Sequence, residues 1–207
     1  MIKIAVLVSG GGTNLQALID ARESGDLKNA EISLVISSIN GAYAVERAKK
    51  AGIKAITIER KKYAVLSEFD SAIEQALSEN KIDLVVLAGF LSILGQKTLL
   101  SYQNKIINVH PALIPSFCGK GFYGIRVHKA VLEYGVKVTG ATVHFVNDII
   151  DGGKIILQKA IDIQKDDTPE SLQQRVMREC EWVLLPKAVA MFCAGEINAE
   201  YEVRNVK

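Results

Sequence analysis

The sequence lacks the features of a secreted, membrane-spanning or metal-binding protein. Its three cysteines, Cys118, Cys180 and Cys193, are odd in number and far apart, so they form neither a Cys-x-x-Cys pair nor a disulfide framework. No stretch approaches about 18 uncharged apolar residues, and the apolar run at residues 1–5 is too short for a signal peptide. No two histidines have ligand spacing together with an acid. These absences predict a cytoplasmic protein that neither binds a metal nor enters a membrane.

Other classes of function are disfavoured in the same way. The net charge is +2 without a long basic run, so nucleic acid is not expected as a partner. The sequence contains no Gly-Lys-Ser/Thr and no Gly-x-Ser-x-Gly, which argues against a Walker-type nucleotide loop and a nucleophilic serine. The 207 residues, 49% of them hydrophobic, suffice for one compact α/β domain or two small ones.

What the sequence does contain is an alternation of apolar runs and amphipathic segments. The apolar runs expected to form strands are residues 4–8, 32–36, 53–58 and 82–89, and the first and last of these are typical of strands buried on both faces. The segments with helical periodicity are residues 15–23, 44–50, 66–77 and 127–134. This order predicts a doubly wound, mostly parallel sheet, in which ligands bind beyond the carboxyl ends of the strands.

The last third of the chain has a different pattern. Residues 137–146 and 155–163 alternate around a turn, which predicts a C-terminal antiparallel hairpin. Thr168 and Pro169 are a typical helix start. The long C-terminal helix that begins there is expected to run past Trp182, with Pro186 kinking it or starting a new helix.

A glycine-rich loop, residues 9–14, separates the first strand from the first helix. Backbone N–H groups at such a junction bind phosphate well, because the helix dipole also favours an anion there. A dinucleotide fingerprint does not fit, since Leu15 stands at the third glycine position and Ser37-Ser38 where a ribose-binding acid is wanted. The loop therefore predicts a phosphate or phosphosugar site, and the alternative is a tight turn without a ligand.

Residues 106–111 predict a buried strand that ends in an amide and an imidazole. Side chains two apart share one face of a strand, so Asn108 and His110 project side by side while Val109 points into the core. Pro111 ends the strand. An amide donor beside a titratable ring suits a carbonyl oxygen that becomes negative. The alternative is a structural pair.

Further polar candidates lie at the same predicted sheet edge. Asp148 and Asp151 follow the first strand of the hairpin, and His144 precedes them on a half-buried strand where a structural role is favoured. His128, near a helix start, is expected to be exposed and inert. The apolar loop at residues 90–95 either packs on the core or walls a flat organic ligand.

Several of these stretches together resemble one family. Residues 9–15, 87–90, 108–115 and 139–153 are similar to the phosphoribosylglycinamide formyltransferases among the folate-dependent formyltransferases. The resemblance implies a Rossmann-like formyltransferase fold as a single domain over residues 1–207. Its phosphate-binding half would be about residues 1–100, and its folate and catalytic half about residues 101–207.

The resemblance also implies a set of site residues. The implied catalytic residues are Asn108, His110 and Asp151. The implied residues for the substrate phosphate and ribose are Gly11, Gly12, Thr13, Asn14 and Glu181. The implied folate-binding residues are Leu91, Ser92, Ile93, Leu94, Asn108, Val146, Asn147, Asp148 and Asp151. Two departures from the family concern Ser92, where many members have Arg, and Trp182, where His is frequent.

The implied reaction transfers the formyl group of 10-formyltetrahydrofolate to the amine of glycinamide ribonucleotide, in de novo purine biosynthesis. The amine would attack directly, with Asn108 and His110 stabilising the oxyanion and Asp151 relaying a proton. No metal is implied, and the partners would be these two small molecules, bound by a monomer or homodimer. The alternatives are a formyltetrahydrofolate hydrolase, with water as acceptor, and a non-catalytic phosphosugar-binding module.

Overall fold

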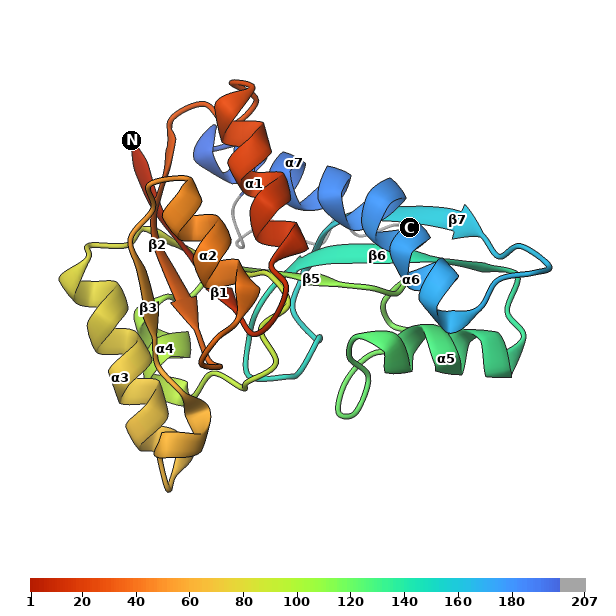
Figure 1. Cartoon of the computed structure of the whole chain (residues 1–207), viewed down its shortest axis with the longest axis horizontal. Coiled ribbons are helices and arrows are strands. Elements are labelled where there is room, and N and C mark those ends of the chain that lie inside the picture. Colours follow the sequence, from red (N-terminus) through yellow and green to blue (C-terminus); the bar gives the residue numbers. More distant parts are fainter. Residues whose placement is uncertain (198–207) are drawn as a thin grey trace, which may run out of the picture.

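The computed structural model describes residues 1–197, which form seven strands and seven α-helices around one sheet (Figure 1). The strands are β1 Ile2–Val8, β2 Ala30–Ser37, β3 Ala55–Thr57, β4 Leu84–Leu87, β5 Ile106–His110, β6 Val138–Phe145 and β7 Ile155–Asp162. The helices are α1 Thr13–Glu23, α2 Tyr43–Lys50, α3 Leu66–Glu79, α4 Gln96–Ser101, α5 Ile125–Tyr134, α6 Pro169–Val176 and α7 Trp182–Cys193. A short 3₁₀ turn, η1, covers Arg60–Lys62, and a π-helical turn, η2, covers Met177–Glu181.

The strand order is β3-β2-β1-β4-β5-β6-β7, so the predicted doubly wound sheet is confirmed. The chain first moves outward from β1 to β3 and then returns to the other side of β1 with β4. All pairings among β1 to β5 are parallel, and the predicted hairpin of β6 and β7 adds two antiparallel pairings at one edge. The switch point between β1 and β4 is where such sheets bind ligands.

Alternating side chains of β1 separate two apolar clusters. Ile4, Val6 and Val8 face the cluster formed with α1, α2 and α7, which lie together over one face of the sheet (Figure 1). Ala5 and Leu7 face the cluster on the other side, which α3 covers. The strand is therefore buried on both faces, as its continuous apolar run predicted. Among residues 1–197, no helix combines the length and the apolar character needed to cross a membrane.

The C-terminal helical region begins as predicted but is interrupted earlier than predicted. The Thr168 side chain accepts a hydrogen bond from the Ser171 N–H, and the Ser171 hydroxyl accepts one from the Thr168 N–H, which together form a capping box. The alternative of a new helix starting at Pro186 is wrong, because Pro186 lies inside α7 and the helical region is interrupted upstream of it, at η2. One wide turn there accommodates an extra residue before the segment that carries the proline.

The capping box yields a stability prediction. Thr168→Ala removes the side-chain acceptor at the helix start and should lower the free energy of unfolding by about 1 kcal/mol. Thr168→Ser retains a hydroxyl at the same position and should keep most of the stability. Chemical denaturation of both variants measures the difference, and equal losses in the two would contradict a capping role.

Candidate active site

A cleft of about 330 Å³ opens at the carboxyl ends of β4 and β5. Its walls are the loop after β4, the end of β5, the loop before α5 and the turn between β6 and β7. All nine residues predicted for folate line it: Leu91, Ser92, Ile93, Leu94, Asn108, Val146, Asn147, Asp148 and Asp151. His110 lines it as well, so the structure brings the predicted folate-binding residues and the predicted catalytic residues together.

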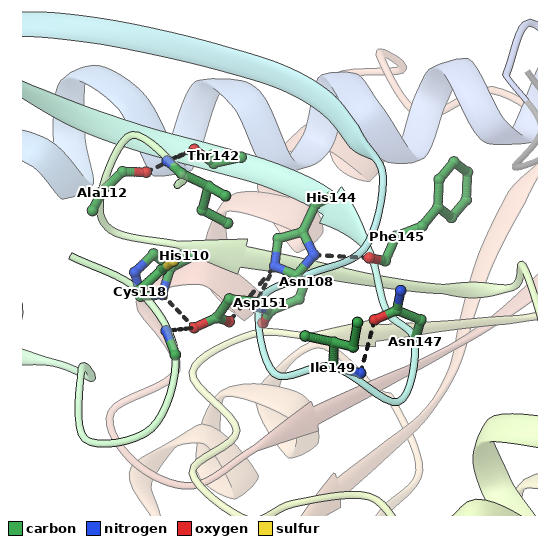
Figure 2. A network of polar contacts seen from close by, with 12 residues as sticks. Asn108, His110, Ala112, Cys118, Thr142, His144, Phe145, Asn147, Ile149 and Asp151 are labelled. Carbon is green, nitrogen blue, oxygen red and sulfur yellow. Dashed lines mark hydrogen bonds and ion pairs between the residues drawn. The ribbon is translucent and has the colours of Figure 1, made fainter. Parts of the chain in front are cut away.

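Asn108 and His110 reach this cleft because β5 alternates as predicted. Val109, between them, is buried in the apolar cluster on the side of α1 and α7. His110 is only 4% exposed. Its Nε2 donates a hydrogen bond to the Phe117 carbonyl oxygen at 2.9 Å, since a carbonyl can only accept. Nε2 is therefore occupied by the Phe117 carbonyl, and the other ring nitrogen, Nδ1, faces Asp151. The distance between Nδ1 and Asp151 Oδ2 is 3.6 Å (Figure 2).

Asp151 lies between two imidazoles on a tightly closed turn. Its φ of 55° is in the left-handed region, which aspartate tolerates better than most residues. A Cβ at Gly153 would come within 1.7 Å of the Phe145 carbonyl oxygen, so only glycine lets the turn close on the end of β6. The Gly119 N–H donates to Asp151 Oδ2 at 2.8 Å, which ties the loop before α5 to the carboxylate.

His144 belongs to the same cluster, although the sequence favoured a structural role for it. Its Nδ1 donates to the Phe145 carbonyl oxygen at 2.8 Å. Its Nε2 lies 3.1 Å from Asn108 Nδ2 and 3.7 Å from Asp151 Oδ1 (Figure 2). Burial lowers the pKa of His144, which favours the neutral ring whose Nε2 accepts from the Asn108 amide.

The pairing register explains why His144 was missed. Asn108 of β5 lies opposite His144 of β6, and this antiparallel partnership brings the two side chains together. The sequence predicted both strands but not their mutual register. Thr142, two residues before His144, was also missed; its hydroxyl donates to the Ala112 carbonyl and accepts the Ile114 N–H, which anchors the loop after β5.

The expectation that His128 is exposed is wrong. Its side chain on α5 is fully buried, and neither ring nitrogen has a hydrogen-bond partner in the part of the chain that is described. Burial, and to a lesser degree the nearby His110, lowers the pKa of His128 to about 4. His128 precedes the buried Val131 by three residues, a helical spacing that could have indicated its burial.

The predicted phosphate loop follows β1, next to the strand that leads into the cleft. Gly12 has a φ of 71°, and a Cβ there would lie 2.6 Å from the Ala44 Cβ of α2. At Gly11, by contrast, an added Cβ would meet nothing within 4 Å. The fold therefore requires glycine at position 12 but not at position 11.

Asn14 and Glu181 are in contact with each other. Asn14 Nδ2 donates to Glu181 Oε2 at 2.7 Å, and both side chains are buried. Burial raises the pKa of Glu181 to about 7, and the hydrogen bond from Asn14 partly offsets this effect. The η2 turn brings both Glu181 and Met177 to the start of α1, where Thr13 Oγ1 lies 3.8 Å from Met177 Sδ. Thr13 and Trp182 also line a separate groove of about 730 Å³ between α1 and α7.

Within residues 1–197, no group of three or more His, Cys, Asp or Glu side chains could hold a metal ion. The cluster of Asn108, His110, His144 and Asp151 instead offers hydrogen-bond donors and proton acceptors in a partly apolar cleft. Such a set suits the transfer of an acyl group by general acid–base chemistry.

Comparisons with known proteins agree with this chemistry. The sequence profile of the formyl transferase family matches residues 2–189. The chain is 41% identical over 198 residues to phosphoribosylglycinamide formyltransferase of Haemophilus influenzae, covering 96% of this chain and 90% of that protein. Glycinamide ribonucleotide transformylase 1 from Symbiobacterium toebii has a similar structure, with a TM-score of 0.88 at 39% identity over 94% of this chain and 89% of that one.

The chain therefore belongs to the formyl transferase family. Within the family it is similar to phosphoribosylglycinamide formyltransferases, in sequence and in structure. It is also 42% identical over 197 residues to the trifunctional purine biosynthetic protein adenosine-3 of Gallus gallus. That alignment covers 95% of this chain, which spans about a fifth of the length of the trifunctional protein, 19%.

The buried Glu181 predicts a pH dependence of stability. The unfolded chain releases the carboxyl proton near the ordinary pKa of 4.5, whereas the folded chain holds it up to about pH 7. The free energy of unfolding should therefore fall with rising pH between these values, on the order of 3 kcal/mol in total. Glu181→Gln removes the titrating group. Compared with the wild type at the same pH, this variant should therefore be more favoured at pH 8 than at pH 4.

Denaturant unfolding of the wild type and of Glu181→Gln at a series of pH values measures this difference. Glu179→Gln, an exposed carboxylate of the same turn, controls for the loss of one negative charge. Parallel stability curves for the wild type and Glu181→Gln would show that Glu181 is not held protonated by burial.

Proposed function

We propose that this chain transfers the formyl group of 10-formyltetrahydrofolate to the amine of glycinamide ribonucleotide, a step of purine biosynthesis. The observation that carries the proposal is the cleft in which Asn108, His110 and Asp151 converge, at the same edge of the sheet as the glycine loop after β1. The partners would be these two small molecules, and the chain would act in the cytoplasm as a monomer or homodimer.

Asn108 would act on the developing oxyanion. One N–H of its amide is directed at His144 Nε2, which leaves the second for the formyl oxygen. As the amine attacks the formyl carbon, the carbonyl π bond becomes a negative oxygen, and a fixed donor in a partly buried site stabilises that charge. His110 would add a second polar group on the same face of β5.

Asp151 would receive the proton that the attacking amine loses. Its carboxylate lies 3.6 Å from His110 Nδ1 and 3.7 Å from His144 Nε2, so a proton can pass among these groups. When the tetrahedral intermediate collapses, the bond from the formyl carbon to the folate nitrogen breaks and that nitrogen takes up a proton. The reaction needs no covalent enzyme intermediate and no net proton.

The folate would lie against the apolar rim of the cleft. Leu91, Ile93, Ile149 and Ile150 are large apolar side chains that remain exposed there, which is unusual unless a ligand covers them. The substrate phosphate would bind the backbone of the glycine loop with Gly11, Gly12, Thr13 and Asn14. Glu181 would accept hydrogen bonds from the ribose hydroxyls.

A test of Asn108 uses a matched control in the same cleft. Asn108→Asp replaces the donor by an acceptor that repels an oxyanion, so kcat should fall by about 10²–10³-fold or more. Asn147→Asp places the same added charge on another residue of the cleft, whose side chain accepts the Ile149 N–H. It should reduce kcat far less. Steady-state kinetics and folate binding on both variants provide the comparison, and similar kcat values would remove Asn108 from the mechanism.

The experiment that separates a transferase from the alternative hydrolase varies the acceptor. A phosphate anchored beside the cleft would hold the amine in place, and such positioning is worth roughly 7–11 kcal/mol of barrier. Release of tetrahydrofolate should therefore be slow alone and rise by orders of magnitude with glycinamide ribonucleotide. Formylated ribotide should accumulate in equal amount. Rapid release that ignores the ribotide would establish the hydrolase instead.

A further inference from the structure

Helix α2 donates hydrogen bonds to two consecutive carbonyl groups of the glycine loop. The Ala44 N–H donates to the Gly10 carbonyl oxygen at 3.1 Å. Arg47 Nε donates to the Gly11 carbonyl oxygen at 2.8 Å. The contact between Gly12 and Ala44 that excludes a Cβ shows how closely the loop and the helix approach. Two consecutive peptide groups are thus fixed against one helix.

The orientation of these peptides has a consequence for the opposite side of the loop. In a trans peptide the C=O and the following N–H point in opposite directions. Because the carbonyls of Gly10 and Gly11 point at α2, the N–H groups of Gly11 and Gly12 point away from it. Neither N–H has an acceptor within residues 1–197. If the carbonyls turned instead toward the ligand, their negative ends would repel a phosphate.

Arg47 is itself held in place. Its Nη1 donates to Gln16 Oε1 at 2.9 Å, and its guanidinium lies 5.0 Å from the centre of the Tyr43 ring. Gln16 in turn donates to Asp20 on α1. Across residues 1–197, Arg47 forms no ion pair with a carboxylate, so its charge is not neutralised there. The planar guanidinium of Arg47, whose Nε and Nη1 form a two-donor fork, therefore joins the loop to the first turn of α1.

We propose that Arg47 is a positioning residue for the phosphate subsite of the glycine loop. It keeps the Gly11 carbonyl turned away, so that the N–H groups of Gly11 and Gly12 face the phosphate, and it adds a positive charge behind them. The inference rests on the proposed function, because the phosphate belongs to the ribotide substrate. Arg47 acts through the loop and does not touch the reacting atoms.

Three variants test this role. Arg47→Met removes both the fork and the charge, and Arg47→Lys keeps the charge but lacks the planar fork that bridges two acceptors. Lys50→Met is the control, because Lys50 lies on the same helix and also approaches the Tyr43 ring, at 5.8 Å, but has no contact with the loop. For each variant, the KM of both substrates, kcat and the thermal midpoint are measured.

We expect Arg47→Met to raise the KM for glycinamide ribonucleotide by about tenfold or more, the loss of one charge-assisted hydrogen bond. The KM for the folate and kcat should stay within about twofold of wild type. Arg47→Lys should show a smaller rise in the ribotide KM, and Lys50→Met none. The affinity for the ribotide without folate, measured by titration calorimetry, should weaken in parallel.

The proposal is overturned if Arg47→Met matches Lys50→Met. It is also overturned if both KM values and kcat change together, since a purely structural role would not distinguish the substrates. Should Arg47→Met fail to fold, Arg47→Lys decides alone, and an unchanged ribotide KM in it would refute the role of the fork. Failure of the proposed function is separate, because it would appear as wild-type protein that neither binds nor formylates the ribotide.

Discussion

The hydrogen bond between the Asn108 amide and His144 is the contact on which the proposed catalytic cluster depends. It requires a neutral His144 ring, which the burial of this β6 side chain favours, and a proton on Nδ1, which the hydrogen bond to the Phe145 carbonyl oxygen secures. Only then does Nε2 accept, and only then is the amide group of Asn108 oriented with its second N–H free. The antiparallel register of β5 and β6 supplies the pairing, so the orientation of one side chain is decided by the reversal of strand direction at this edge of the sheet.

The two halves of the proposed site are joined by a hydroxyl. Ser9, at the end of β1, accepts the Leu91 N–H at 2.8 Å and shares a hydrogen bond with the Ser38 hydroxyl at 2.6 Å. This pair links the carboxyl ends of β1 and β2 to the loop after β4. On the far side of that loop, the buried Asp70 carboxylate accepts the N–H groups of Gly95, Lys97 and Thr98. The wall of the cleft is therefore fixed at both of its ends by polar groups from other elements.

Strand and helix periodicity were enough to predict the sheet, the hairpin and the presence of Asn108 and His110 in one cleft, because the apolar runs coincide with largely buried strands at β1, β2, β4 and β5. What the sequence could not provide was long-range register. The pairing of His144 with Asn108, the anchoring of Ile114 by Thr142 and the contact of Asn14 with Glu181 all join segments at least 28 residues apart. The burial of His128 was missed for a different reason, because a histidine near a helix start was expected to face solvent although its spacing from Val131 places it on the buried face of α5.

Gly11 and Gly12 of the glycine loop differ in whether the protein itself has room for a side chain. Helix α2 would reject a side chain at Gly12 whether or not a ligand is ever bound, whereas at Gly11 the protein itself leaves open space. A mutational library sorted for soluble, folded protein and the same library sorted for growth should thus agree at position 12 and disagree at position 11. Position 44 belongs to the same contact, because the Ala44 Cβ is the nearest atom that a side chain at Gly12 would meet. Under the proposed function, substitution at position 12 is limited by packing against α2 and substitution at position 11 by the bound phosphate.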